Sequence, residues 1–304
     1  MNNVRNKIKW NLRMTWPLYL MIAPAVVLVF IFNYYPMYGM VIAFQKYQPS
    51  KGFSGSDFVG LYWFKYLFGM SDFAQIVGNT FSIALMKIFF GQLAPLTFAL
   101  LLNEIKTLYF KRTVQTMVYL PNFLSWVIVG TIFVDLLSTN GIVNQFLGLF
   151  GVEPIFFLGG NKYFQGTIVA VDVWKNFGWN SIIYLAALTG INLELYEAAQ
   201  IDGANHIRRA WHITLPGILP TVMLLSTLAL GNVLNAGFEQ LLMMYNPAVY
   251  RSGDILDTFV YRSGLLETQF SLAAAVGALK SVCGFIMIVF SYWLVGRFSD
   301  YRVF

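Results

Sequence analysis

Charged residues are scarce in this sequence of 304 residues. Asp, Glu, Lys and Arg together make up 11% of the chain, whereas a typical soluble domain contains about 25%. Hydrophobic residues make up 58% of the chain, and its mean hydropathy is +0.62. So few charged side chains cannot cover the surface of a soluble globular protein. The composition therefore predicts an integral membrane protein.

Cysteine is also nearly absent, and Cys283 has no second cysteine with which to form a disulfide within the chain. No glycine-rich phosphate loop is present, so we expect no ATP site of that kind. His206 and His212 are six residues apart and do not share a helical face, which argues against a metal site. Nucleophile elbows and nucleic-acid-binding motifs are likewise missing. These absences argue against an enzyme and leave a channel or a transporter.

Six apolar stretches are long enough to cross a bilayer, which requires about 20 apolar residues in a helix. They are Trp16–Phe44, Ile76–Leu102, Val114–Leu137, Gln165–Thr189, Gly217–Met244 and Phe270–Gly296. We expect the helices to continue through Pro95 and Pro121, because neighbouring helices can satisfy the carbonyl group that a proline leaves free. The sequence thus predicts an all-α integral membrane fold with six transmembrane helices.

The distribution of lysine and arginine predicts the orientation of the chain. With the N-terminus inside, the inner segments carry eleven of these residues and the outer segments six, as the positive-inside rule requires. Both termini are then cytoplasmic, and the chain begins with a basic segment at 1–15. We expect one transmembrane domain over 1–304 in the cell membrane. It comprises the first helix and an external segment at 16–75, and a core at 76–304 with a cytoplasmic segment at 190–216.

The cytoplasmic segment contains a predicted short helix with small side chains. Asn192 is a suitable N-cap, and Glu194 and Glu197 follow in the first turns, where the helix dipole favours negative charge. Gly203 can end the helix because glycine adopts a positive φ at low cost. A second short helix follows, and Pro216 is expected to stop it. Residue types alone fit an ordinary helical loop slightly better than a docking surface.

The spacing of the whole segment decides between these two interpretations. It contains E-A-A, a glycine four residues after the second alanine, and I-x-L-P after nine further residues. The residues concerned are Glu197, Ala198, Ala199, Gly203, Ile213, Leu215 and Pro216. This pattern resembles, without a gap, the EAA motif of permease subunits in bacterial ABC importers, above all the binding-protein-dependent sugar permeases of the maltose type. The stretches FEQLLMMYNPAVY and DILDTFVYRSGL are similar to the Gram-positive group of complex oligosaccharide and lipoprotein-type permeases.

The resemblance implies the MetI-like fold of type I ABC importer permeases, in which this motif forms a coupling helix. That helix sits in a cleft of a separate ATPase and transmits the closure of the ATPase to the membrane helices. Glu197 would meet a basic group of the ATPase, and Gly203 would be the turn between the two short helices. The coupling residues implied are Glu197, Ala198, Ala199, Asp202, Gly203, Ala204, Ile213, Leu215 and Pro216.

The resemblance also implies partners and a function. The chain would assemble with a second, homologous permease subunit, two ABC ATPase subunits and an external solute-binding protein. It would import an oligosaccharide, derived from a polysaccharide, by alternating access. We expect no cofactor or metal in this chain, since ATP and Mg²⁺ would bind to the ATPase. The alternatives are an ABC permease for a non-sugar solute and a self-contained secondary carrier, although the EAA motif and the scarcity of paired intramembrane acids argue against the carrier.

Polar side chains inside the spans are candidates for the substrate path, because they are costly in lipid and should face the interior. Asn232, Asn235 and Glu239 are spaced three and four apart and are expected on one helical face, although hydrogen bonds between helices explain the asparagines equally well. Lys280, and more weakly Lys87, is expected to face a cavity or a carboxylate. The other candidates are Trp174, Asn180 and Tyr184 in the fourth span, and Asn122 beside Pro121.

Overall fold

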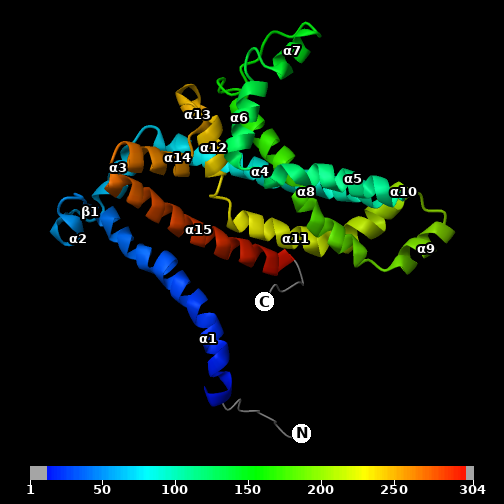
Figure 1. Cartoon of the computed structure of the whole chain (residues 1–304), viewed down its shortest axis with the longest axis horizontal. Coiled ribbons are helices and arrows are strands. Elements are labelled where there is room, and N and C mark those ends of the chain that lie inside the picture. The colour runs from blue at the N-terminus through cyan, green and yellow to red at the C-terminus, as the bar shows by residue number, and fades with distance from the viewer. Residues whose placement is uncertain (1–11, 299–304) are drawn as a thin grey trace.

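The structure, a computed structural model, describes residues 12–298, and helices dominate it (Figure 1). The basic segment that we place in the cytoplasm lies outside the described residues up to position 11. Four helices in the described part are long and apolar enough to cross a membrane: Trp16–Phe44, Phe73–Asn103, His206–Gly231 and Phe270–Trp293. Two bent helix pairs raise the number of candidate spans to six, in agreement with the sequence prediction.

The first span diverges from the others in Figure 1, and none of the residues in its most apolar window is buried. It consists of α1 (Leu12–Val29), a π-helical turn (Phe30–Tyr34) and a 3₁₀ segment (Tyr35–Phe44). The segment predicted to be external follows, in the order β1 (Gln45–Lys46), α2 (Gly52–Gly55), β2 (Asp57–Phe58) and α3 (Tyr62–Gly69). The two short strands pair antiparallel, with Gln45 opposite Phe58.

The centre of the molecule is the pair formed by α4 (Phe73–Asn103) and α8 (Phe164–Thr189), which pack along each other. Fully buried side chains from both helices, such as Ile83 and Ile168, belong to the largest core cluster. Gly178 brings α8 close to the neighbouring helix α5, because a Cβ at this position would collide with the backbone carbonyl of Val118. Pro95 lies inside the continuous helix α4, as predicted.

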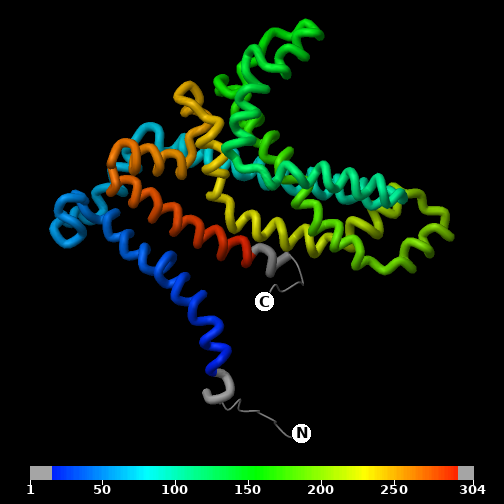
Figure 2. The backbone as a smooth tube through the Cα atoms, in the orientation of Figure 1, coloured from blue at the N-terminus to red at the C-terminus, as the bar shows by residue number. Residues whose placement is uncertain are grey.

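The third span is not one continuous helix, and the expectation for Pro121 is wrong. α5 (Leu108–Tyr119) ends in a 3₁₀ turn (Leu120–Phe123) that contains Pro121, and α6 (Trp126–Leu136) then departs at 101° (Figure 2). Proline has no N–H with which to continue the α-helical hydrogen bonds. The side chain of Ser125 caps the new helix. A loop with α7 (Ile142–Gly148) leads on to α8.

The fifth span also differs from the prediction of one helix over Gly217–Met244. α11 (Leu215–Gly231) ends at Gly231, residues 232–237 are irregular, and α12 (Phe238–Met244) starts after Gly237, whose φ is +93°. The elements that follow are a 3₁₀ turn (Pro247–Val249), α13 (Tyr250–Gly253), α14 (Leu256–Tyr261), a π-turn (Arg262–Leu266) and α15 (Phe270–Phe298). α15 packs against α11 and α14.

The segments assigned to opposite sides of the membrane lie at opposite ends of the molecule. α9 (Leu193–Ile201) and α10 (His206–Arg209) form one end, and α9 is bent by 72° from α8. β1 and α2 form the other end (Figure 1). α15 starts near the end with β1, where the hydroxyl of Ser271 accepts a hydrogen bond from the N–H of Tyr47, whereas α11 leads into the end with α10 (Figure 1).

Candidate functional site

The segment at 190–216, called the coupling segment below, begins with a helix that is capped at both ends. The side-chain oxygen of Asn192 accepts a hydrogen bond from the N–H of Glu194 at 3.0 Å. The N–H groups of Gly203 and Ala204 donate to carbonyls three and five residues earlier, at 3.0 and 2.8 Å. These two bonds form a Schellman motif, and Gly203 has the positive φ, +76°, that the motif requires. Both predicted ends of the helix are confirmed.

The surface of the coupling segment is open. Glu197, Ala198, Asp202 and Gly203 are exposed, and Glu197 forms no ion pair within the described residues. Five large apolar side chains of the same segment are more than half exposed: Leu193, Leu195, Ile201, Ile207 and Trp211. Exposed apolar side chains beside small and acidic residues are typical of a surface that binds another protein.

The second half of the coupling segment runs into the fifth span without a break. α10 is followed by a π-turn (Ala210–Thr214), in which the N–H of Leu215 bonds to the carbonyl of Ala210, five residues earlier. The expectation that Pro216 stops this helix is wrong. The helix continues through Pro216, which is the second residue of α11 and follows the π-turn, where the hydrogen-bond pattern is already shifted by one residue.

Two side-chain contacts fix the coupling segment. Within it, the hydroxyls of Tyr196 in α9 and Thr214 in the π-turn are 2.9 Å apart. Nδ1 of His206 in α10 lies 2.7 Å from Oε2 of Glu104, which directly follows α4. The first contact links α9 to the π-turn that leads into α11, and the second links α10 to the end of α4.

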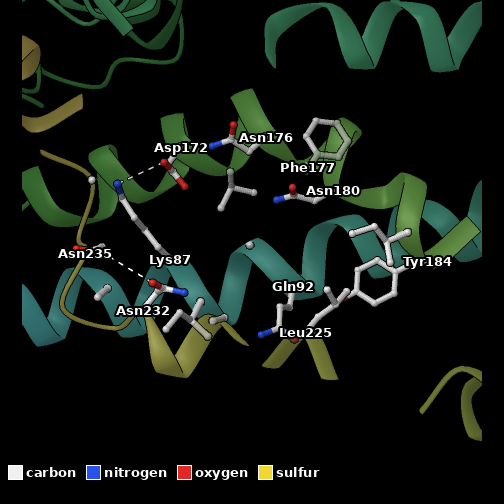
Figure 3. A pocket seen from close by; sticks show the side chains of 17 residues that line it. Lys87, Gln92, Asp172, Asn176, Phe177, Asn180, Tyr184, Leu225, Asn232 and Asn235 are labelled. Carbon is white, nitrogen blue, oxygen red and sulfur yellow. Dashed lines mark hydrogen bonds and ion pairs between the residues drawn. The ribbon is translucent and has the colours of Figure 1, made fainter. Parts of the chain in front are cut away.

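A cavity of about 370 Å³ lies between α4, α8 and α11 (Figure 3). Its polar lining residues are Lys87, Gln92, Asp172, Asn176, Asn180, Asn232 and Asn235. The rings of Phe177 and Tyr184 and several aliphatic side chains complete the wall. A few convergent polar groups in a mostly apolar wall are typical of a site for a small molecule.

Lys87 reaches from α4 across this cavity towards α8 (Figure 3). Its Nζ donates to Oε1 of Gln240 at 2.5 Å and lies 3.3 Å from Oδ1 of Asp172. Gln240 is fully buried and donates its amide to the carbonyl of Ile168 at 2.7 Å. Gly237 lies so close to the ammonium group that any side chain there would collide with it. Three elements, α4, α8 and the start of α12, thus meet at one ammonium group.

Comparison with known proteins identifies the family. Residues 87–300 match the family described as the binding-protein-dependent transport system inner membrane component. This chain belongs to that family. The permease is a multi-pass membrane protein with the MetI-like type I importer fold, and it is a transport subunit rather than an enzyme. ATP is hydrolysed on a separate ATPase subunit.

Three similar proteins show which members of this family the permease resembles. The polygalacturonan/rhamnogalacturonan transport system permease protein YteP of Bacillus subtilis strain 168 is 40% identical over 93% of this chain and 88% of its own length. Protein LplB of the same strain is 41% identical over 94% of this chain and 91% of its own length. A solved structure of the bacterial alginate ABC transporter in complex with alginate pentasaccharide-bound periplasmic protein has a TM-score of 0.87 and 34% identity, covering 95% of this chain and 97% of that one.

The three substrate-path candidates predicted in the fifth span lie in different surroundings. Asn232 is the C-cap of α11 and Asn235 lies in the irregular segment, and both line the cavity. Glu239 follows in α12, is exposed and does not line the cavity. The predicted common helical face does not exist, because the helix ends at Gly231.

Lys87 and Lys280 both face carboxylates, as predicted. Lys87 pairs with Asp172 in the cavity, whereas Nζ of Lys280 lies 2.6 Å from Oδ1 of Asp257 in α14. Lys280 does not line the cavity. The permease therefore has two intramembrane ion pairs in the described residues, and one of the two borders the cavity.

The predicted cluster in the fourth span is divided between two sides of α8. Asn180 and Tyr184 line the cavity. Trp174 does not, and its ring packs edge-on against an aromatic ring of α6. Asn122 lies in the turn after α5 and donates its amide to the side chain of Asn176 at 3.2 Å. Asn122 therefore touches a cavity residue without lining the cavity itself.

Some residues at the cavity were not predicted from the sequence. One is Asp172, although it lies four residues before Asn176 and eight before the predicted Asn180, so that the three form one polar stripe on α8 and the signal was available in the sequence. Gln240 gave no such signal, because its partner Lys87 is 153 positions away in the chain. Gln92 likewise stands alone among apolar residues of α4.

A separate ion pair stabilises the segment between α12 and α15. Nη2 of Arg262 lies 2.6 Å from Oδ2 of the buried Asp254, and the guanidinium group stacks 4.5 Å above the ring of Tyr250. Burial, together with the nearby Tyr250 and Asp254, raises the pKa of the neighbouring Tyr245 to about 12. Tyr245 is therefore neutral at physiological pH. The charges of this cluster are those of the Arg262–Asp254 ion pair.

Proposed function

We propose that the permease imports oligosaccharides derived from a polysaccharide, by alternating access coupled to a separate ATPase. Two similar proteins support this substrate class, since YteP is named as a polygalacturonan and rhamnogalacturonan permease and the solved transporter is one for alginate. The cavity supports it as well, because its amide groups can bind sugar hydroxyls and its apolar side chains and rings can pack on sugar faces.

The observation that carries the coupling proposal is the unbroken connection from the coupling segment to the cavity. α10, the π-turn and α11 form one continuous helix of 26 residues, and its far end supplies the cavity residue Ala229 and the C-cap Asn232. A displacement of α9 by an ATPase would therefore move a wall of the cavity. In this proposal the ATPase contacts the exposed residues Glu197, Ala198, Asp202 and Gly203. The half-buried Ala199 and Ala204 lie behind them.

The remaining coupling residues have a different role in the proposal. Ile213 and Leu215 are half-buried and Pro216 is exposed, and all three lie where the coupling segment becomes α11. We assign them to the transmission of movement rather than to direct docking. Leu215 makes the hydrogen bond that closes the π-turn.

The proposed assembly contains this permease, a second homologous permease, two ATPases and an external solute-binding protein. The end with α9 would face the cytoplasm, together with both termini, and the end with β1 would face outwards. The single domain over 1–304 would contain the core at 76–304 and the coupling segment. Asn180, Tyr184, Asn232 and Asn235 would line the substrate path, and Glu239 would lie at its outer mouth. Asn122, Trp174 and Lys280 would support neighbouring helices.

The first experiment is to express the permease with its partner permease, an ATPase and the solute-binding protein, and to measure uptake into proteoliposomes. We expect uptake of oligogalacturonides that requires ATP. Uptake driven by an ion gradient alone, in the absence of any ATPase, would contradict the proposal and favour a secondary carrier. ATP-dependent uptake of a non-sugar solute alone would leave the coupling proposal intact and overturn the substrate class.

The charge of Glu197 provides a second test of coupling. Glu197→Lys should reduce co-purification of the ATPase and ATP-driven uptake by at least about tenfold, because a docking acid would become a repelling cation. Glu153→Lys is the matched control, since Glu153 is an exposed acid in the loop after α7. It should leave co-purification of the ATPase unchanged. A Glu197→Lys variant that retains the ATPase and normal uptake would count against docking at this residue.

A further inference from the structure

Lys87 combines two properties that the other lysines of the spans do not share. It is the cationic side chain of the cavity lining, and its pairing with Asp172 is loose. The distance from Nζ to Oδ1 of Asp172 is 3.3 Å, whereas the Lys280–Asp257 and Arg262–Asp254 pairs both measure 2.6 Å. Carboxylate contacts of about 2.7–2.9 Å are usual for a strong charge-assisted bond.

The ammonium group of Lys87 is fixed by a neutral partner. The buried Gln240 accepts one of its three N–H groups at 2.5 Å and is itself anchored to the backbone of α8. Asp172 is the more exposed member of the ion pair, with 20% of its side chain accessible against 10% for Lys87. Gln240 thus holds the ammonium group of Lys87 in place without help from Asp172, and the carboxylate of Asp172 can move away.

Asp172 has a second cation within reach of its charge. Lys175, one turn further along α8, interacts electrostatically with Asp172 while its Nζ donates to the backbone carbonyl of Asn122 at 2.9 Å. Residues three apart on a helix are neighbours, so Asp172 can move towards Lys175 without losing all cationic contact. After an exchange of carboxylates at Lys87, Asp172 would therefore still lie near one cation, Lys175.

We infer that Lys87 binds a carboxylate group of the transported sugar, and that Asp172 occupies this position when no substrate is bound. This inference rests on the proposed function and specifies it: the cavity would be selective for oligosaccharides that contain uronic acids. The incoming carboxylate takes the place of Asp172 at Nζ of Lys87, while Gln240 keeps the ammonium group in position. The amides of Asn176 and Asn232 then contact sugar hydroxyls.

The test compares two forms of one sugar in the assembled transporter. Uptake of trigalacturonate is measured for the free acid and for the methyl ester, both at concentrations that saturate the solute-binding protein. The two forms differ in charge and share the same ring and linkage. The same solute-binding protein serves every variant, so its own preference cancels when the acid-to-ester ratio of a variant is divided by that of the wild type.

The double variant Lys87→Gln/Asp172→Asn removes the ion pair and keeps amide hydrogen bonding. We expect its acid-to-ester ratio to fall at least about tenfold, the change expected when one charge-assisted hydrogen bond to substrate is lost. The matched control is Lys280→Gln/Asp257→Asn, which removes the other intramembrane pair away from the cavity. This control should keep the wild-type ratio even if total uptake decreases. Lys87→Arg, which retains the charge, should also keep it.

A chemical rescue separates recognition of charge from packing. In a Cys283→Ser background, Lys87→Cys should lower the acid-to-ester ratio, and labelling with 2-aminoethyl methanethiosulfonate should restore it by returning an ammonium group. Equal loss of both forms in the Lys87 variants, without rescue of the ratio, would show a structural clamp and overturn the inference. Failure of the wild-type transporter to take up either form would contradict the proposed oligosaccharide import and the inference with it.

Discussion

Gly203→Val should reduce ATP-driven uptake at least about tenfold, through loss of the turn in the coupling segment. Gly203 has a φ of +76°, a conformation that a β-branched residue adopts only with strain of about 1–2 kcal/mol or more. No atom lies within 4 Å of a Cβ built at this position, so the effect comes from the backbone and not from a collision. The Schellman bonds of Gly203 and Ala204 would open, and the end of α9 would change direction.

The matched control at this position is Gly203→Asn. Asparagine tolerates the left-handed conformation far better than valine and occupies similar open space. We expect it to retain most of the uptake and the bound ATPase. Uptake by proteoliposomes and co-purification of the ATPase check both variants. If valine and asparagine behave alike, the direction of the chain at Gly203 does not govern coupling.

Gly178→Val should destabilise the whole membrane domain. A Cβ at Gly178 would overlap the backbone carbonyl of Val118, and backbone cannot move aside as a flexible side chain can. Overpacking of this kind costs about 1–3 kcal/mol, and more where backbone must shift. For a chain of this size we expect a decrease in Tm of about 5 °C, which thermal unfolding in detergent would detect.

The control for this prediction lies on the same helix. Gly166 also belongs to α8, is exposed, and has no atom within 4 Å of its Cβ position. Gly166→Val should therefore leave Tm nearly unchanged. An equal decrease for both variants would indicate a general effect of valine in α8. No decrease for Gly178→Val would mean that α5 and α8 are not in close contact there.

The coupling segment could be predicted in detail because its structure is determined locally. Asn192 caps the helix through a bond to a residue two positions away, and Gly203 ends it through bonds that span five positions. Such signals are present in a short stretch of sequence. The failure at Pro216 has a local cause too. A proline removes one hydrogen bond of an α-helix, and the π-turn at Ala210–Thr214, which shifts the hydrogen-bond pattern directly before Pro216, lets the helix continue through it.

The cavity could be predicted only in part, because its contacts join distant parts of the chain. Lys87 was expected to meet a carboxylate, but nothing in the spacing indicates Asp172, which is 85 positions away on another helix. The sequence predicts one helix over Gly217–Met244 because Asn232, Asn235 and Glu239 are spaced three and four apart, as on one helical face. This spacing does not reveal the irregular segment at 232–237, where Gly237 must leave room for the ammonium group of Lys87.

The π-turn at Ala210–Thr214 also preserves the rotational phase between α10 and α11. A π-turn holds one residue more than the α-helical turn it replaces, so the extra residue is absorbed within the turn. Deletion of one residue inside the π-turn would therefore leave α10 and α11 close to their present phase. Deletion of one residue in the part of α11 before Leu225 would instead turn α10 by about 100° relative to the wall of the cavity.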